Sequence, residues 1–239
     1  MSQTADEISP AVAYHSQLAG TWENRYLRAG FQARVRVLGE CLRGVDIKDR
    51  RWLDAGCGSG TLSRYLADRG GNVLGIDASA DMVRNANLTF LKGAQRHVEF
   101  RQIDSIADLP ISDCSLDGIL CSSVLEYVPD IHACLAEFAR ILRPGGHLLV
   151  SVPNRDSIVR RGQVSGYRAA QAVGRKWFRF LEHSRHEFTS RSFRSVLEEF
   201  GFTTDKVIPF GSPIPQWLQR RAYVGSLLMF LARRRYPGL

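Results

Sequence analysis

The 239-residue sequence lacks long hydrophobic runs, and none approaches the roughly 20 apolar residues that a membrane-spanning helix needs. Its first ten residues, MSQTADEISP, carry early acids and no apolar segment of the kind that marks a secretory signal peptide. It also lacks low-complexity stretches and repeats at a fixed period. These absences exclude membrane-spanning and repeat architectures, and they predict a cytoplasmic protein.

Cysteine is sparse and scattered, with neither a C-x-x-C pair nor a cluster with histidine. The five thiols belong to Cys41, Cys57, Cys114, Cys121 and Cys134. This spacing excludes a disulfide framework and a zinc site, so no metal is expected. Scattered thiols are typical of a reducing cytoplasm.

Acidic residues are fewer than basic ones, 24 against 32, which gives a net charge of +8. This excess has two interpretations: an attraction to nucleic acid or an anionic membrane, or mere surface solubility. The hydrophobic share of 44% and the charged share of 23% are those of an ordinary globular protein. The length suffices for one sizeable α/β domain.

Short apolar strands alternate with helical patterns along most of the chain, which predicts a parallel, doubly wound sheet with helices on both faces. The expected strands are 51–54, 72–77, 97–103, 115–121, 147–152 and 203–208, and the expected helices are 31–42, 61–69, 79–91 (with Ser79 as N-cap), 131–142 and 190–200. Residues 216–224 form a short helix in this interpretation. Residues 226–232 fit a strand or a helix, and we favour a last strand because it would cover the edge of the sixth.

Two segments fall outside this alternation. Residues 1–45 are predicted to form an N-terminal helical lid before a domain at 46–239. Residues 154–187 interrupt the domain with arginines and aromatic residues and are predicted to form a basic helical lid over the substrate. This insertion has three interpretations: a site for an anionic substrate or anionic lipids, a nucleic-acid contact, or a solvated amphipathic helix. The tail Arg233-Arg234-Arg235 after an apolar run permits the same membrane interpretation.

A glycine-rich loop follows the first strand, as Asp54-Ala55-Gly56-Cys57-Gly58-Ser59-Gly60. It departs from the dinucleotide pattern G-x-G-x-x-G because the third glycine comes one place early. The Asp54 carboxylate would repel a pyrophosphate and attract a cation, and Asp77 ends the second strand where an acid can accept hydrogen bonds from ribose hydroxyls. The pattern favours an adenosyl ligand without phosphate over a mere tight turn, although Asp77 alone could be a helix N-cap.

The segments LDAGCGSG, GIDAS, DGILCSSVLEYVPD and ILRPGGHLLVSVPN together resemble class I S-adenosylmethionine-dependent methyltransferases. The likeness covers Arg51 to Pro209 and is greatest to the branch that contains the ubiquinone and menaquinone biosynthesis methyltransferases. It implies a Rossmann-like, seven-stranded, mostly parallel sheet with its last strand antiparallel. It also implies S-adenosyl-L-methionine as cofactor and S-adenosyl-L-homocysteine as product.

The resemblance also implies roles for single residues. Asp54, Gly56 and Gly58 would line the methionine end of the cofactor, with Cys57 in the same loop as a small apolar side chain. Asp77 would bind the ribose, and Ala78, Asp104 and Ser105 would lie at the adenine, although Asp104 is also a common turn residue. Ser122 and Ser123 would lie near the sulfonium and the substrate. Cys121 is interpreted as a small apolar residue, and Glu126 as a structural acid that faces a helix N-terminus in preference to a cofactor contact.

The sequence contains no clear motif for a general base. Relatives often carry histidine where this chain has Tyr127, so His186 is the best remaining candidate, against a plain surface or hydrogen-bonding histidine. Tyr14, His15 and His183 are weaker candidates.

We expect methylation of a small molecule, with O-methylation of an aromatic, quinone-type or lipid-like acceptor favoured by the resemblance. Methylation of nitrogen or carbon in another metabolite stays open, as do a nucleic-acid methyltransferase and a cofactor-binding protein without catalysis. The segment after strand four lacks a signature of the N/D-P-P-Y type, so nucleic acid is not the expected partner. A monomer or homodimer, with peripheral contact to an anionic membrane, completes the expectation.

Overall fold

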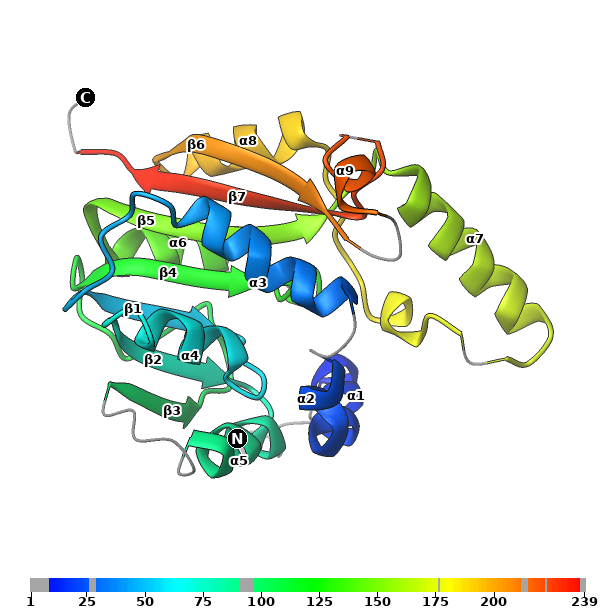
Figure 1. The fold of residues 1–239 in the computed structure, drawn as a ribbon, viewed down its shortest axis with the longest axis horizontal. Helices are drawn as coiled ribbons and strands as arrows, with labels where there is room; N and C mark the ends of the chain where they lie inside the picture. The colour runs from blue at the N-terminus through cyan, green and yellow to red at the C-terminus, as the bar shows by residue number, and fades with distance from the viewer. Residues whose placement is uncertain are drawn as a thin grey trace, which may run out of the picture.

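The computed structural model describes residues 9–25, 29–90, 97–175, 177–211, 215–221 and 223–236. Helices cover both faces of a central sheet (Figure 1). The helices are α1 Pro10–Leu18, α2 Trp22–Arg25, α3 Ala29–Cys41, α4 Thr61–Ala67, α5 Ala80–Phe90, α6 Ile131–Ile141, α7 Ile158–Ala172, α8 Ser190–Glu199 and α9 Gln216–Gln219, with 3-10 turns η1 Ala19–Thr21 and η2 Arg179–Glu182. The strands are β1 Arg51–Ala55, β2 Asn72–Asp77, β3 Val98–Gln102, β4 Leu116–Ser122, β5 Leu142–Pro153, β6 Phe202–Phe210 and β7 Leu227–Arg234.

The seven strands lie in the order β3-β2-β1-β4-β5-β7-β6. The pairs from β3 to β5 are parallel, and β7 runs antiparallel to both β5 and β6. This arrangement confirms the predicted doubly wound, mostly parallel sheet with an antiparallel last strand. The topology puts the ends of β1, β2 and β4 side by side, where ligands bind in open α/β sheets.

Strand β7 forms as predicted, but it does not lie at the edge of the sheet. We expected β7 to cover β6 at the edge of the sheet, but β7 inserts between β5 and β6, and β6 stays the edge strand. The side chains from Leu228 to Ala232 are buried throughout and alternate between the apolar clusters on the two faces of the sheet, as is typical of an interior strand. Strand β6 alternates buried residues with exposed ones such as Thr203 and Asp205, a pattern that suits an edge.

Two of the three apolar clusters found among the described residues hold helices to opposite faces of the sheet. One face carries α6 and α8, and its core includes the fully buried rings of Phe138, Phe193 and Phe230. The other face carries α3 and α4, where Leu38 packs in the same cluster as Trp52. The predicted N-cap of α5 is confirmed, since Ser79 Oγ accepts a hydrogen bond of 3.2 Å from Met82 N.

The N-terminal segment divides into two parts. Helix α3 belongs to the core layer, with Ala33, Leu38 and Cys41 buried in the cluster that includes strand residues of β6 and β7. The predicted lid of residues 1–45 includes this helix, whose apolar face packs on the sheet. Within the described residues, α1, η1 and α2 are the part that lies beyond the ends of the strands (Figure 1).

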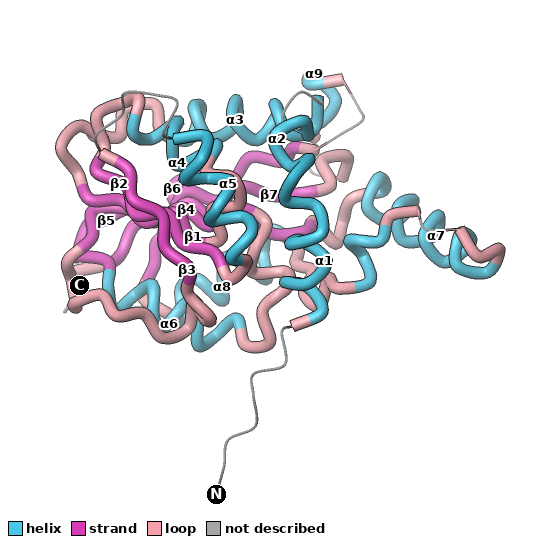
Figure 2. The backbone as a smooth tube through the Cα atoms, turned by 90° about the horizontal axis from the view of Figure 1, so that it is seen from below, coloured by secondary structure: helices cyan, strands magenta, loops and turns pink. Residues whose placement is uncertain are grey.

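The basic insertion forms α7 and η2. In both Figure 1 and Figure 2, α7 extends outward from the body of the molecule. Within the described residues, none of the helices combines the length and the apolar character that crossing a membrane requires.

Candidate active site

A cavity of about 1000 Å³ opens at the carboxyl ends of β1, β2 and β4. All ten residues that the sequence assigned to the cofactor line it: Asp54, Gly56, Cys57, Gly58, Asp77, Ala78, Asp104, Ser105, Ser122 and Ser123. The cavity continues past them to residues of α1, α2, α3, α7 and η2. It therefore has a glycine-loop half and a second half formed by the N-terminal segment and the insertion.

The glycine loop is held close to the second strand. The amides of Gly56 and Cys57 both donate to Ile76 O, at 2.8 and 2.9 Å. Gly56 has φ +76°, and a Cβ there would lie 2.2 Å from Val124 Cγ2. Position 56 therefore requires glycine for both backbone conformation and space.

The Asp77 carboxylate organises the end of β2. Its Oδ2 accepts from Gly58 N and its Oδ1 from Ser79 N, both at 2.9 Å. Burial raises the pKa of this carboxyl, and the two amide hydrogen bonds act in the opposite direction. Since a carboxylate oxygen has more than one acceptor site, each still has capacity to accept from a ligand hydroxyl.

Asp54 is 1% exposed, and its Oδ2 accepts a 2.6 Å hydrogen bond from Ser63 Oγ. Burial raises the pKa of Asp54 to about 7, with a smaller contribution from the charge of Asp77. Cations stabilise a buried carboxylate, so this position favours a positively charged ligand group.

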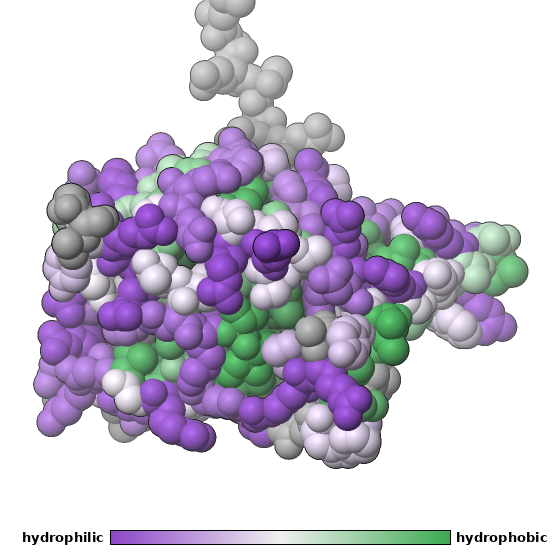
Figure 3. All heavy atoms as spheres, turned by 90° about the horizontal axis from the view of Figure 1, so that it is seen from above, coloured by the Kyte–Doolittle hydropathy of each residue, from purple (hydrophilic) through white to green (hydrophobic). Residues whose placement is uncertain are grey.

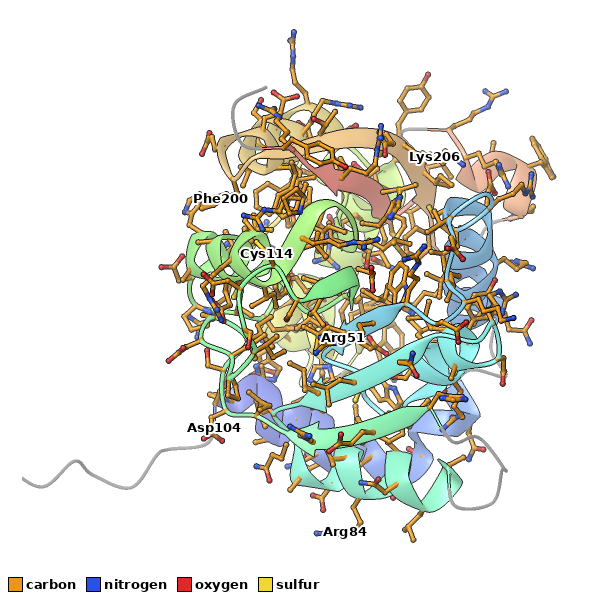
Figure 4. All side chains as sticks on the ribbon, turned by 90° about the vertical axis from the view of Figure 1, so that its left-hand side faces the viewer. Arg51, Arg84, Asp104, Cys114, Phe200 and Lys206 are labelled. Carbon is orange, nitrogen blue, oxygen red and sulfur yellow. The ribbon has the colours of Figure 1, made fainter. Side chains whose placement is uncertain are left out.

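The loop after β4 contains a backbone conformation that side chains rarely adopt. Ser123 has φ +59°, and its amide donates to Ser151 Oγ at 2.8 Å. Its own Oγ accepts from Arg34 Nη2 at 3.1 Å. Asp104 and Ser105, by contrast, are exposed on the loop after β3, where Figure 4 labels Asp104.

An aromatic wall lines the second half of the cavity. The ring of His15 lies 5.6 Å from Trp22 and 5.0 Å from Tyr127, measured between ring centroids. The ring of Trp22 in turn lies 5.7 Å from Phe31, and that of Tyr14 lies 5.2 Å from His15. These five rings, the aromatic wall, present a largely apolar surface of the kind that binds a planar ligand.

Glu126 and Arg160 form a buried ionic network in the second half of the cavity. Both are 3% exposed, and their closest charged atoms are 3.8 Å apart. Arg160 also donates to Glu187 and Ser184 at 2.8 Å, and Ser184 Oγ donates to Glu126. Burial raises the pKa of Glu126 against the opposing effect of Arg160. Glu126 therefore faces the guanidinium of Arg160, a residue in the first turn of α7.

His186 lies outside the set of residues that line the cavity. Its Nε2 is 2.9 Å from Val128 O, and since a carbonyl can only accept, Nε2 carries the proton. This geometry gives His186 the role of tying the insertion to the loop after β4. It does not place the ring where it could receive a proton from a substrate in the cavity.

Arg34 lines the cavity and was missed by the sequence analysis. A signal for it was present. The apolar stripe that begins in α3 runs through Phe31, Val35 and Leu38 to Leu42, just after the helix. Arg34 occupies the i+3 position from Phe31, on the same face. A charged residue on an apolar helical stripe indicates a role in binding or catalysis.

The fold, the acid-flanked glycine loop and the continuous cavity define an S-adenosylmethionine-dependent methyltransferase. The described residues fit this cofactor: the buried acid Asp54 would suit its ammonium group, and Asp77, which has spare acceptor capacity, would suit its ribose hydroxyls. The chain belongs to the methyltransferase domain family, whose model matches residues 21–207.

Curated relatives carry the same assignment. The chain is 31% identical over 162 residues to a ubiquinone biosynthesis O-methyltransferase of Paracidovorax citrulli (strain AAC00-1), which covers 66% of this chain and 67% of that protein. It is 39% identical over 128 residues to the enzyme of the same name from Alkalilimnicola ehrlichii, covering 52% of this chain and 49% of the relative. The match thus spans two thirds of the first relative and about half of the second.

Solved structures show the same fold. An S-adenosylmethionine-dependent methyltransferase from Thermotoga maritima superposes with a TM-score of 0.67 at 19% identity, covering 93% of this chain and 99% of that one. One from Mesorhizobium loti gives 0.61 at 23% identity, covering 82% of this chain and 96% of that one.

Proposed function

We propose that the protein transfers the methyl group of S-adenosylmethionine to an oxygen atom of a phenolic, quinone-type acceptor. The observation that carries this proposal is the single cavity that joins the glycine loop to the aromatic wall. The names of the curated relatives support the acceptor class. When bound, the cofactor supplies a methyl group on a positively charged sulfur.

The glycine-loop half accounts for the cofactor. In this proposal Asp54 binds the ammonium group and Asp77 the ribose hydroxyls. Ala78, Asp104 and Ser105 lie at the adenine, and Gly56, Cys57 and Gly58 give the loop its close approach. Ser122 and Ser123 border the sulfur. What supports these roles is the shared lining and the polarity of each position.

The N-terminal helices act as the lid in this proposal. Trp22 Nε1 lies only 3.1 Å from the point that a Cβ of Gly58 would occupy. Ser16 Oγ and Ser79 Oγ are 2.7 Å apart, which ties α1 to the start of α5. A lid in these positions holds the acceptor near the cofactor and excludes water from both, which favours a displacement between oxygen and sulfonium.

Transfer of a tritiated methyl group tests the proposal. Purified protein is incubated with labelled S-adenosylmethionine and, in parallel, a catechol or hydroquinone, an amine, an activated carbon acid and total RNA. We expect label on the phenolic oxygen. Label on the amine, on carbon or on RNA would replace the proposal by the corresponding alternative, and cofactor binding without transfer to any acceptor would mean a binding protein.

His186→Ala separates a base from a structural tie. Because Nε2 of His186 already donates to Val128 O, we expect turnover within about threefold of wild type and a loss of ~1 kcal/mol in the free energy of unfolding. Steady-state kinetics and urea denaturation measure the two effects. A hundredfold fall in turnover at unchanged cofactor affinity would restore His186 as the base.

We also propose that the protein is cytoplasmic and that its insertion contacts anionic membranes peripherally. Val173 and Trp177 are 70% and 57% exposed at the outer end of the insertion, and Arg161, Arg168 and Arg175 are exposed along it. In Figure 3, apolar and hydrophilic residues lie together at the end of this projection. Apolar side chains beside arginines suit the interface of an anionic bilayer.

Flotation with vesicles tests this contact. Wild type should float with vesicles that contain phosphatidylglycerol and stay behind with phosphatidylcholine alone. Val173→Asp should reduce the bound fraction about tenfold, because a carboxylate is repelled by the surface and costly to bury in it. Leu88→Asp, which makes a similar change at a 54% exposed position on α5, should bind as wild type does. Equal binding of both variants would remove the insertion from the contact.

A further inference from the structure

Three arginines line the cavity in the described part of the chain, and they differ in their surroundings. Arg160 is compensated by the carboxylates of Glu126 and Glu187. Arg185 is exposed to solvent. Arg34 is half-buried and makes, among the described residues, a single hydrogen bond, to the hydroxyl of Ser123.

Arg34 is fixed where the glycine-loop half of the cavity meets the half that contains the aromatic wall. Its guanidinium carbon lies 4.4 Å above the ring of Phe31, a cation–π contact that holds one face of the group. Its Nη2 donates to Ser123, whose backbone is anchored in turn by Ser151 Oγ. The guanidinium is therefore held from both sides, between the aromatic wall and the loop assigned to the sulfur end of the cofactor.

Among the residues that the structure describes, most N–H donors of the Arg34 guanidinium have no partner. An arginine has five N–H groups, and the contact with Ser123 uses one. A half-buried cation with spare donors at the border of a cavity is suited to bind an anionic oxygen.

The charged and titratable groups that face this position come from three elements. Glu126 and Tyr127, on the loop after β4, both feel the charge of Arg34. Arg160 on α7 compensates Glu126, and His15 on α1 lines the same cavity. Because the charge of Glu126 is compensated by Arg160, Arg34 can still attract an anionic ligand.

We propose that Arg34 is a catalytic residue that binds the acceptor oxygen as an oxyanion, so that methyl transfer needs no base from the protein. This inference rests on the proposed phenolic acceptor and adds the means of its activation. It explains why neither Tyr127 nor His186 has to remove a proton.

The step balances without a further reactant. The acceptor hydroxyl releases its proton to water as it binds to Arg34. A lone pair of the resulting oxyanion then forms the bond to the methyl carbon, and the electron pair of the carbon–sulfur bond stays on sulfur. One anion and one sulfonium cation become a neutral ether and a neutral thioether. Arg34 remains charged throughout and stabilises the oxyanion before the transfer.

The test uses 4-nitrocatechol, whose phenol and phenolate absorb at different wavelengths. The full-length protein is saturated with S-adenosylhomocysteine, and the ionisation of the bound probe is followed by absorbance from pH 5 to 10. Turnover of the same probe with S-adenosylmethionine is then measured over the same pH range. Both are done for wild type, Arg34→Gln, Arg34→Lys and Arg43→Gln, an exposed position just beyond α3 that loses the same charge outside the cavity.

We expect the bound probe to ionise about one pH unit lower in wild type and in Arg43→Gln than free in solution. Arg34→Gln should abolish this shift and reduce turnover up to about tenfold at pH 5, where the free probe is mostly protonated, with the deficit closing at high pH where the probe ionises unaided. Arg34→Lys should restore part of both. Affinity for S-adenosylhomocysteine, measured by calorimetry, should stay within about twofold in all variants.

Two results would overturn the inference while leaving the proposed function intact: an Arg34→Gln turnover reduced equally at every pH, or a wild-type probe that ionises at the pH of the free compound. Failure of wild type to bind and methylate any phenol would instead overturn the proposed function, and the role of Arg34 with it.

Discussion

Asp77→Ala should weaken S-adenosylmethionine binding about a hundredfold, ~2.7 kcal/mol, as measured by isothermal titration calorimetry. The charge-assisted hydrogen bonds to the ribose hydroxyls are lost in this variant. The amides of Gly58 and Ser79 also lose the carboxylate oxygens to which they donate at 2.9 Å. The glycine loop and the start of α5 therefore lose their common anchor.

Asp81→Ala is the matched control. Asp81 lies four residues further on, in the first turn of α5, and its exposed carboxylate pairs with Arg84 at 2.8 Å. The control removes a carboxylate from the same helix end without touching the loop, so its affinity should equal that of wild type. Unchanged affinity in Asp77→Ala would contradict the ribose contact.

Asp54→Asn should stabilise the free protein at pH 8 by ~4 kcal/mol and at the same time weaken cofactor binding more than a hundredfold. The pKa of Asp54 is raised to about 7 by burial, from an ordinary value of 3.8. At pH 8 the carboxylate is charged inside the protein, and hydrogen bonds from the hydroxyl of Ser63, at 2.6 Å, and from its backbone offset only part of the cost of burial. Asparagine keeps an acceptor for that hydroxyl and removes the buried charge.

The pH dependence has a defined sign. Between pH ~4 and about 7 the folded protein holds a proton on Asp54 that the unfolded chain has released, so the free energy of unfolding falls as pH rises. This contribution is complete below the unfolded pKa and lost above about 7. The stability gain of Asp54→Asn should therefore be small at pH 4 to 5 and full at pH 8.

Urea denaturation of both proteins at pH 5 and pH 8 measures this difference. Asp68→Asn, at an exposed position just after α4, controls for the loss of one negative charge and should show no such pH dependence. For the cofactor, the affinity of wild type should rise with pH up to about 7, because the ammonium group requires the ionised acid. A gain in stability without loss of affinity would place the ammonium group elsewhere.

The sequence predicted those parts of the site that depend on local chemistry. The glycine loop and the acids at 54 and 77 follow directly from their strands, so their positions are determined by a few residues on either side. Because parallel strands end at one edge of the sheet, the residues after β3 and β4 were also expected in the same place, and all of them line the cavity. Strand order predicts where these residues lie, whereas their roles at the cofactor are implied by the resemblance to class I methyltransferases.

The remaining features depend on contacts between distant segments. The place of β7 between β5 and β6 is set by burial on both faces, which the apolar run 226–232 suggests but does not locate. His186 was assigned from its neighbourhood in the chain, whereas its hydrogen bond to Val128 O spans 58 residues. The contact of Arg34 with Ser123 spans 89 residues and has no local signature beyond a charge on an apolar stripe.

A crystal structure of the protein with S-adenosylhomocysteine tests the central claim most directly. The two ribose hydroxyls should lie within hydrogen-bond distance of the Asp77 carboxylate, the amino group should lie toward Asp54, and the sulfur should lie on the side of Ser123 and Arg34. A nucleoside bound away from the acid at the end of β2, or a dinucleotide accepted in its place, would contradict the claim.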